Sequence, residues 1–204
     1  ITLEFPHLLQ LVEHNQFDTI YHEHFSYFSL HSAALVLQKH GLAVFDVEEL
    51  PTHGGSLRVY ARHAEDNAQP ISTNVARVLG EEKARGMTTL DYYRGFQKKV
   101  DAVKNAFLRF LLEQKAAGQK VAAYGAAAKG NTLLNYCGVR ADLLPFVVDA
   151  SPHKQGKFLP GSHIPVVDES AIRREKPAFI IILPWNLREE IVHQLAYARE
   201  WGAR

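Results

Sequence analysis

The chain of 204 residues has a single cysteine, Cys137, nearly balanced charges and no long apolar run. One thiol excludes an internal disulfide and a zinc site built from several cysteines. No apolar run approaches the ~20 residues that a membrane-spanning helix needs. Lysine and arginine number 23 against 22 aspartates and glutamates, a net charge of +1, whereas a general nucleic-acid binder carries a basic face. We therefore predict a cytoplasmic protein that contacts neither a membrane nor nucleic acid, and the sequence implies no protein partner.

Both ends of the sequence are typical of a chain that continues. ITLEF alternates like a strand already inside a sheet, and Gly202 is typical of a helix C-cap with further chain to follow. We therefore expect these residues to be part of a longer protein.

Residues 1–63 carry patterns that predict the trailing half of an α/β sheet. The expected elements are a strand over ITLEF, a helix from Pro6 to about His14, a helix from Ser29 to Gly41, and strands over LAVFDVEEL and SLRVYARH. Proline suits the first position of a helix, serine the N-cap and glycine the C-terminal end. The turn PTHGG between the last two strands predicts a hairpin or a neighbouring pair.

Residues 64–118 are predicted to form a helical connector. The first part is polar, with Gly80 and Gly86 as interruptions, and Thr88 with Asp91 resembles a capping box. From there one long helix is expected to run to the end of the connector, because its apolar residues recur at helical spacing. These apolar residues are Val100, Val103, Phe107, Phe110 and Leu111.

Residues 119–204 alternate apolar runs with helical segments. The runs KVAAYG, LLPFVVD and AFIIILPW are predicted strands, and LREEIVHQLAYAREWG is a predicted closing helix. Continuous apolar strands separated by helices are typical of a parallel sheet covered on both faces. The fold class is therefore α/β: the trailing half of an α/β sheet, followed by a smaller Rossmann-like parallel-sheet domain.

A glycine-rich turn, residues 125–131, stands where the first strand of this domain ends and a helix begins. Free backbone N–H groups and the helix dipole favour an anion there, and Lys129 can add a charge beside Gly130 and Asn131. The turn matches neither GxGxxG nor a Walker A motif. Phosphate binding is the favoured interpretation, and a tight turn with glycines for close packing is the alternative.

Two further segments are expected at the same edge of the sheet. Asp149 ends the second strand, where such folds hold a ribose hydroxyl, and a basic segment with His153 and Lys154 follows it. Trp185 and Asn186 close the third strand, where the indole can stack on a base or wall the core. A solvated loop is the alternative for the basic segment.

The segment YHEHFSY places Tyr21, His22, Glu23, His24 and Tyr27 within seven residues. The two histidines share one face if the segment is extended, as paired metal ligands sometimes do, but no third ligand stands at a familiar spacing, so no metal site is predicted. Proton transfer is the favoured alternative: Glu23 orients a histidine base, and a tyrosine donates to a developing oxyanion. The purely structural interpretation is a polar cluster that holds a loop in place.

The turn before SLRVYARH contains a pair of glycines followed by Ser56. Gly55 allows a positive φ or the close approach of a ligand to the backbone. Taken alone, the turn is an ordinary strand connection.

Five ordered segments resemble the C-terminal part of the bacterial S-adenosylmethionine-dependent sugar C-methyltransferases. They are FDTIYHEHFSYFS, THGGSLRVY, YGAAAKGNTLLNYCG, VVDASPHKQGKFLPGSHIPV and LPWN, and they cover nearly the whole chain. The resemblance implies three parts: a zinc-binding N-terminal domain, an S-adenosylmethionine-binding Rossmann domain and a C-terminal Rossmann-like domain. It makes residues 1–63 the trailing half of the Rossmann-type methyltransferase sheet. It also implies a nucleotide-linked 4-keto-deoxysugar as substrate, methylated at the carbon beside the ketone.

The resemblance assigns roles to the polar clusters. His24 is the general base that produces an enolate, while Tyr21 and Glu23 position the sugar or the base. The expected contacts of the nucleotide sugar are Gly55, Ser56, Lys129, Gly130, Asn131, His153, Lys154, Trp185 and Asn186. S-adenosylmethionine and zinc are expected to be bound before Ile1, so these residues alone are expected to be inactive.

A nucleotide-binding module linked to NAD or coenzyme A is the rival interpretation of residues 119–204. Such a module does not need the YHEH segment, and a scaffold domain would leave both polar clusters unexplained.

Overall fold

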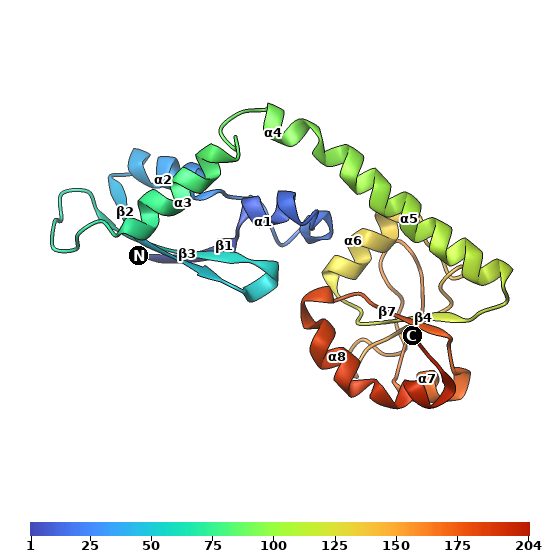
Figure 1. The fold of residues 1–204 in the computed structure, drawn as a ribbon. Helices are drawn as coiled ribbons and strands as arrows, with labels where there is room; N and C mark the ends of the chain where they lie inside the picture. Colours follow the sequence, from blue (N-terminus) through green and yellow to red (C-terminus); the bar gives the residue numbers. More distant parts are fainter. The chain divides into compact units, whose positions relative to one another are not determined.

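The fold is described by a computed structural model of residues 1–204. It is α/β, with a three-stranded sheet and a separate parallel four-stranded sheet (Figure 1), compatible with a Rossmann-like fold, and the predicted fold class is confirmed. The chain divides into two compact units. The first contains Ile1–Phe17 and His22–Val100, and the second contains Asp18–Tyr21 and Asp101–Arg204.

The first unit is built on an antiparallel sheet with the strand order β1-β3-β2. Its strands are β1 (Thr2–Pro6), β2 (Leu42–Leu50) and β3 (Ser56–His63). Its helices are α1 (Leu8–Glu13), α2 (Leu30–Lys39), α3 (Thr73–Ala84) and α4 (Asp91–Arg94). The predicted pairing of β2 with β3 is confirmed, because Leu50 lies opposite Ser56 across the turn. The N-cap Ser29 is also confirmed: its hydroxyl accepts the N–H of Ser32.

Helices α2 and α3 cover one face of this sheet. The core beneath them consists of Leu30, Leu37, Val44, Val47, Leu57, Val59, Ala61, Val75 and Val78. The helix predicted from Pro6 is wrong at its start, because Pro6 is the last residue of β1 and pairs with Ser56. A proline is tolerated there because β1 is an edge strand of this sheet.

The helical connector differs from its prediction in three places. Gly80 lies inside α3 and does not interrupt it. The predicted capping box is wrong, because α4 has Leu90 at its N-cap without a side-chain hydrogen bond. The single long helix is also wrong: it breaks at Gly95, between α4 and α5 (Phe96–Ala116). Glycine is a poor helix former, which explains the position of the break.

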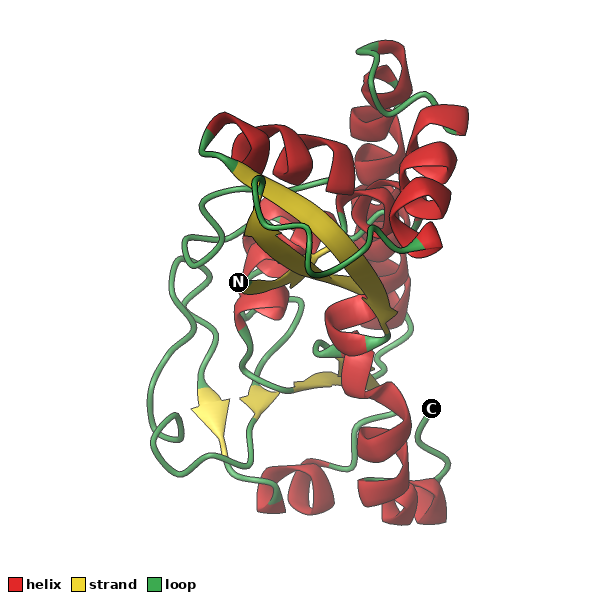
Figure 2. Ribbon diagram, turned by 90° about the vertical axis from the view of Figure 1, so that its left-hand side faces the viewer, coloured by secondary structure: helices red, strands yellow, loops and turns green.

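The second unit is built on a parallel sheet with the strand order β6-β5-β4-β7, whose strands are yellow in Figure 2. The strands are β4 (Val121–Tyr124), β5 (Val147–Val148), β6 (Val166–Val167) and β7 (Phe179–Ile182). The helices are α6 (Ala128–Cys137), α7 (Ser170–Glu175) and α8 (Arg188–Gln194). The closing helix was predicted too long: α8 ends at Gln194, and a 3-10 helix, Ala196–Trp201, follows.

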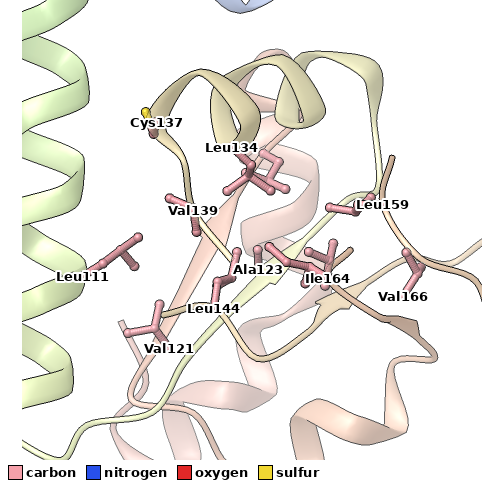
Figure 3. Packing of buried hydrophobic residues seen from close by; sticks show 12 residues of the cluster. Leu111, Val121, Ala123, Leu134, Cys137, Val139, Leu144, Leu159, Ile164 and Val166 are labelled. Atoms are coloured by element: carbon pink, nitrogen blue, oxygen red, sulfur yellow. The ribbon is translucent and has the colours of Figure 1, made fainter. Parts of the chain in front are cut away.

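Apolar side chains fill both faces of the parallel sheet. Leu111 of α5 and Leu134 of α6 pack with Val121 and Ala123 of β4 on one face (Figure 3). Ile172 of α7 and residues of α8 pack on the other face. Burial of apolar surface, at roughly 25 cal/mol per Å², is the main stabilising contribution of such a core. This packing sets the start of α6 directly after the carboxyl end of β4, the edge where α/β sheets bind ligands.

None of the helices combines the length and the apolar character that crossing a membrane requires.

Candidate functional site

The glycine-rich turn after β4 is packed tightly against the end of β7. Gly125 has φ +95°, and a Cβ atom there would lie 2.4 Å from Cδ of Pro184. A Cβ atom on Gly130 would lie 2.7 Å from Cβ of Leu183. Real Cβ contacts are longer than this, so the two glycines let the turn and α6 approach β7. Close packing is therefore one role of these glycines.

The N-terminus of α6 presents free backbone donors. Its N-cap residue, Ala127, makes no side-chain cap, and the first helical hydrogen bond runs from the N–H of Asn131 to the carbonyl of Ala127. Within residues 1–204 the N–H groups of Ala128, Lys129 and Gly130 therefore have no hydrogen-bond acceptor. Free N–H groups and the positive end of a helix dipole form an arrangement that binds anions.

Asp149 is buried and connects the loops that follow β4 and β5. Its Oδ2 accepts the N–H of Ala126 at 2.7 Å, and its Oδ1 accepts the N–H of Ser151 at 2.8 Å. Lys154 donates from Nζ to Oδ2 of Asp149 at 3.2 Å and to the carbonyl oxygen of Ala126 at 2.9 Å. Both carboxylate oxygens thus join the loops after β4 and β5, where the sequence predicted a ribose contact. Exposed His153 belongs to the same loop.

A cavity of about 250 Å³ lies beside the start of α6. Its walls are Ala126, Ala127, Ala128, Asn131, Lys154, Lys157, Phe158, Leu159, Pro160 and Val166. Two lysines give it positive charge, and Oδ1 of Asn131 is buried without a hydrogen-bond partner in residues 1–204. Pockets for whole small-molecule ligands are about 300–1,000 Å³, so this cavity suits part of a larger ligand.

The side chain of Lys129 turns to Trp185 and Asn186, the segment that the sequence predicted at the same edge of the sheet. This side chain is buried, and Nζ donates to Oδ1 of Asn186 at 3.0 Å and lies 4.3 Å from the ring centroid of Trp185. Burial lowers the pKa of Lys129, although the charge of Asp18 opposes this shift. The ammonium that reaches the glycine-rich turn belongs to Lys154.

Asp18 completes this second cluster and was not singled out in the sequence. The indole Nε1 of Trp185 donates to Oδ2 of Asp18 at 2.6 Å. Burial raises the pKa of Asp18, and it outweighs the opposing effects of that hydrogen bond and of the Lys129 charge. Trp185 and Asn186, predicted as ligand contacts, are thus engaged with protein groups of the second unit.

The YHEH segment is divided between the units. Tyr21 belongs to the second unit, and the residues from His22 onward belong to the first. His22 and Glu23 form a turn, so the extended geometry in which the two histidines share a face is not present. His24 stacks on Tyr27, with ring centroids 6.1 Å apart. In residues 1–204 no three histidine, cysteine or carboxylate side chains gather as metal ligands.

His24 and Glu23 line a cavity of about 390 Å³ in the first unit. The complete lining is Leu3, Glu4, Phe5, Pro6, Glu23, His24, Phe25, Ser26, Phe28, Ala33, Val36 and Leu37. Most of these side chains are apolar, while an imidazole and two carboxylates supply the groups that can exchange protons. The cavity can therefore hold a largely apolar group beside a proton acceptor.

The paired-glycine turn is closed by protein atoms. Gly55 has φ +117°, and a Cβ atom there would lie 2.6 Å from Cγ of Gln10. Ser56 is buried, and its hydroxyl donates to the carbonyl oxygen of Thr52 at 3.0 Å. The close approach that Gly55 allows is thus to the side chain of Gln10.

A family model and a known protein both match this chain. A family model described as the C-methyltransferase C-terminal domain matches residues 51–204. The chain is also similar to the C-methyltransferase NovU of Streptomyces niveus, with 38% identity over 202 residues. That match covers 99% of this chain and 48% of the relative, so the chain spans about half the length of the curated relative that it matches.

Proposed function

Because the chain belongs to the family of the C-methyltransferase C-terminal domain, we propose that it is the substrate-handling part of a sugar C-methyltransferase. Its membership confirms the resemblance to the C-terminal part of these enzymes. The proposed substrate is a nucleotide-linked 4-keto-deoxysugar, and the carbon beside the ketone receives the methyl group. The enzyme is proposed to work in the cytoplasm.

The placement of His24 is the observation that carries this proposal. The side chain lies on the wall of a mainly apolar cavity, next to Glu23 and within the YHEH segment. A carbon beside a ketone becomes nucleophilic only after it loses a proton. Histidine is the residue whose ordinary pKa lies nearest to neutrality, which suits a general base. His24 is proposed to take that proton, and the electron pair of the broken C–H bond passes into the enolate.

Tyr21 and Glu23 are proposed to support this step. A phenol can donate a hydrogen bond to the enolate oxygen, and a carboxylate can orient an imidazole and stabilise its protonated form. An oxyanion donor contributes most when it is already in place as the charge develops. The two residues therefore act on orientation and charge, while His24 moves the proton.

The methyl donor is proposed to be S-adenosylmethionine, which supplies an electrophilic methyl group. The three strands of the first unit are all antiparallel to their neighbours. The first unit thus offers no glycine-rich turn between a parallel strand and a helix, the usual place for such a cofactor. The first unit therefore does not fit the donor, and residues 1–204 contain no gathered ligand set for the zinc ion that the resemblance implies. We assign both to the part of such enzymes outside this chain.

The diphosphate of the nucleotide sugar is proposed to bind at the N-terminus of α6, beside Lys154 and Lys157. Replacing Lys154 with alanine is expected to weaken the binding of thymidine diphosphate to the full-length protein by roughly 1–3 kcal/mol, the range for a charge-assisted hydrogen bond. Binding should also weaken as salt rises, because exposed charges are screened over about 8 Å at physiological ionic strength. Calorimetric titration at two salt concentrations measures both effects.

Lys115→Ala is the matched control for Lys154→Ala. Lys115 is an exposed lysine of the second unit that pairs with Asp142 at 3.4 Å, and it does not line the cavity beside α6. Its removal should leave the affinity for thymidine diphosphate unchanged. Equal affinity of wild type and Lys154→Ala would show that the diphosphate does not bind at this turn.

The proposed chemistry is tested by proton exchange in the absence of the methyl donor. Full-length protein in D₂O should replace the hydrogen beside the ketone of the nucleotide-linked 4-keto-deoxysugar with deuterium, as followed by proton NMR. The rate should exceed that of the enzyme-free reaction, because a positioned general base contributes about 10²–10⁴-fold. The corresponding sugar with a hydroxyl in place of the ketone should not exchange. Exchange no faster than without the protein would refute His24 as a base acting on this substrate.

A further inference from the structure

We propose that Trp185 is a positioning residue that fixes the segment Asp18–Tyr21 on the second unit and so sets the place of Tyr21. Trp185 acts together with Lys129 and Asn186. This inference rests on the proposed function, because Tyr21 opens the YHEH segment. It gives the three side chains a role different from the nucleotide contact that their sequence predicted.

The first support is the hydrogen bond between Trp185 and Asp18. Asp18 is only 7% exposed, and its Oδ2 accepts the indole N–H at 2.6 Å. A carboxylate taken out of water needs such a partner, and a hydrogen bond to a charged group is stronger than one between neutral groups. The two residues are 167 positions apart in the chain, so the bond joins the segment to the end of β7.

A second contact holds the same segment two residues later. The hydroxyl of Thr132 on α6 lies 3.3 Å from the carbonyl oxygen of Ile20 and 3.3 Å from that of Ala128, so the two oxygens share its proton. Thr19, between the two contacts, is 3% exposed. The segment is thus bonded to the second unit at Asp18 and at Ile20, directly before Tyr21.

Lys129 and Asn186 hold the indole in place. The ammonium of Lys129 lies 4.3 Å from the ring centroid of Trp185 and donates to Asn186 at 3.0 Å. A cation over an aromatic face is attracted to it, most strongly for tryptophan. Burying a lysine is unfavourable unless its charge is compensated. Here the ring face, the amide oxygen and the carboxylate of Asp18 compensate it.

The position of the anchor gives it a consequence for the reaction. The chain enters the second unit at Asp18 and returns to the first at His22, so the anchored segment ends where the rest of the YHEH segment begins. A misplacement of about 1 Å of a catalytic group can reduce a rate by about 100-fold. Loss of the anchor should therefore slow the reaction more than it weakens substrate binding.

The test is Trp185→Phe in the full-length protein, which removes the indole N–H and keeps an aromatic ring. We expect kcat for methyl transfer to fall about 10- to 100-fold, with KM for the nucleotide sugar changed less than about threefold. Asp18→Asn keeps an acceptor for the indole and loses the charge, so its kcat should be intermediate. Trp201→Phe is the matched control, since its indole N–H donates to the carbonyl of Pro177, and its kcat should equal that of wild type.

Amide hydrogen exchange gives a second readout that a general loss of stability would not reproduce. In Trp185→Phe the amides of residues 18–21 should exchange faster, while those of β4 and β5 stay as protected as in wild type. A raised KM with unchanged kcat would overturn the proposal and make Trp185 a ligand contact. Unchanged kcat and unchanged exchange at residues 18–21 would also overturn it. Failure of the proposed function is recognised separately, because wild type would then not catalyse deuterium exchange.

Discussion

The variant His24→Asn of the full-length protein is expected to transfer methyl groups about 10²- to 10⁴-fold more slowly than wild type. Asparagine keeps much of the size and polarity of histidine but cannot accept a proton near neutral pH. The cavity that His24 lines is formed mainly by other side chains, so affinity for the nucleotide sugar should stay within about threefold. Steady-state kinetics and a binding titration of the same preparations measure the two quantities.

His22→Asn is the matched control for this result. His22 is an exposed histidine in the same segment, two residues before His24, and it does not line the cavity. Its replacement should change the rate by no more than a few-fold. Glu23→Gln should give an intermediate loss, because orientation of the base is degraded while the base remains.

Two outcomes contradict the assignment of the base. Full turnover by His24→Asn would remove His24 from the proton transfer. A large loss in His22→Asn, with normal turnover in His24→Asn, would assign the base to the neighbouring histidine. Deuterium exchange without the methyl donor should follow the same order as turnover, since it reports the proton-transfer step alone.

The regular elements could be predicted where the local pattern is strong. β4 and β7 are continuous apolar runs of four residues between helical segments, which is the pattern of buried parallel strands. β6 has two residues, Val166 and Val167, and so short a strand has no periodicity to detect. The break at Gly95 was missed because the apolar spacing continues across it.

The polar clusters could be predicted as sequence segments, while their partners could not. The glycine-rich turn and the YHEH segment are local in the chain and therefore visible. Hydrogen bonds such as Trp185 to Asp18 and Lys154 to Asp149 depend on how loops meet in space. No spacing rule shows that the ammonium group at the turn is that of Lys154. The ammonium group of Lys129 packs against the Trp185 ring instead, and only the structure shows this.

The sequence pattern around Glu82 could have predicted a buried, paired carboxylate. On α3 it follows Val75 and Val78 at helical spacing, so a carboxylate stands on the apolar face of the helix. Charged residues on such a face are rarely buried unless they are paired. Its partners belong to other elements, α2 and the residue before α1, and only the structure identifies them.

Glu82 satisfies the start of α2 from a fully buried position. Its Oε1 accepts the N–H of Leu30 at 2.6 Å, and its Oε2 accepts the N–H of His31 at 2.9 Å. Oε1 also lies 2.7 Å from Nε2 of His7, which is buried too. Ser29 accepts the next N–H, so side chains satisfy all three of the first donors of α2.

Glu82→Ala is therefore expected to lower the free energy of unfolding of the first unit by about 3–5 kcal/mol, the usual cost of removing one partner of a buried pair. Two backbone donors and the His7 imidazole would be left buried without an acceptor. Urea denaturation followed by circular dichroism measures the loss. Amide hydrogen exchange at Leu30 and His31 should show that it centres on the start of α2.

The same carboxylate gives the wild type a defined response to acid. Burial by itself would raise the pKa of Glu82, but the hydrogen bonds from His7, His31 and Leu30 outweigh it and lower the pKa below its ordinary value of 4.5. The stabilisation is therefore fully present above about pH 4.5 and is lost as the pH falls through the lowered pKa. In Glu82→Ala this part of the acid response should be missing.

Glu81→Ala is the matched control, one position earlier on the same helix. Glu81 is an exposed residue that pairs with Arg77 four residues before it, and such surface pairs contribute about 0.3–0.5 kcal/mol. Its removal should leave the unfolding curve and the acid response almost unchanged. If Glu82→Ala and Glu81→Ala unfold at the same urea concentration, the buried carboxylate does not hold α2 to α3. A loss in Glu82→Ala that is equally large at pH 3 and pH 7 would mean that the side chain acts through its volume and not through its charge.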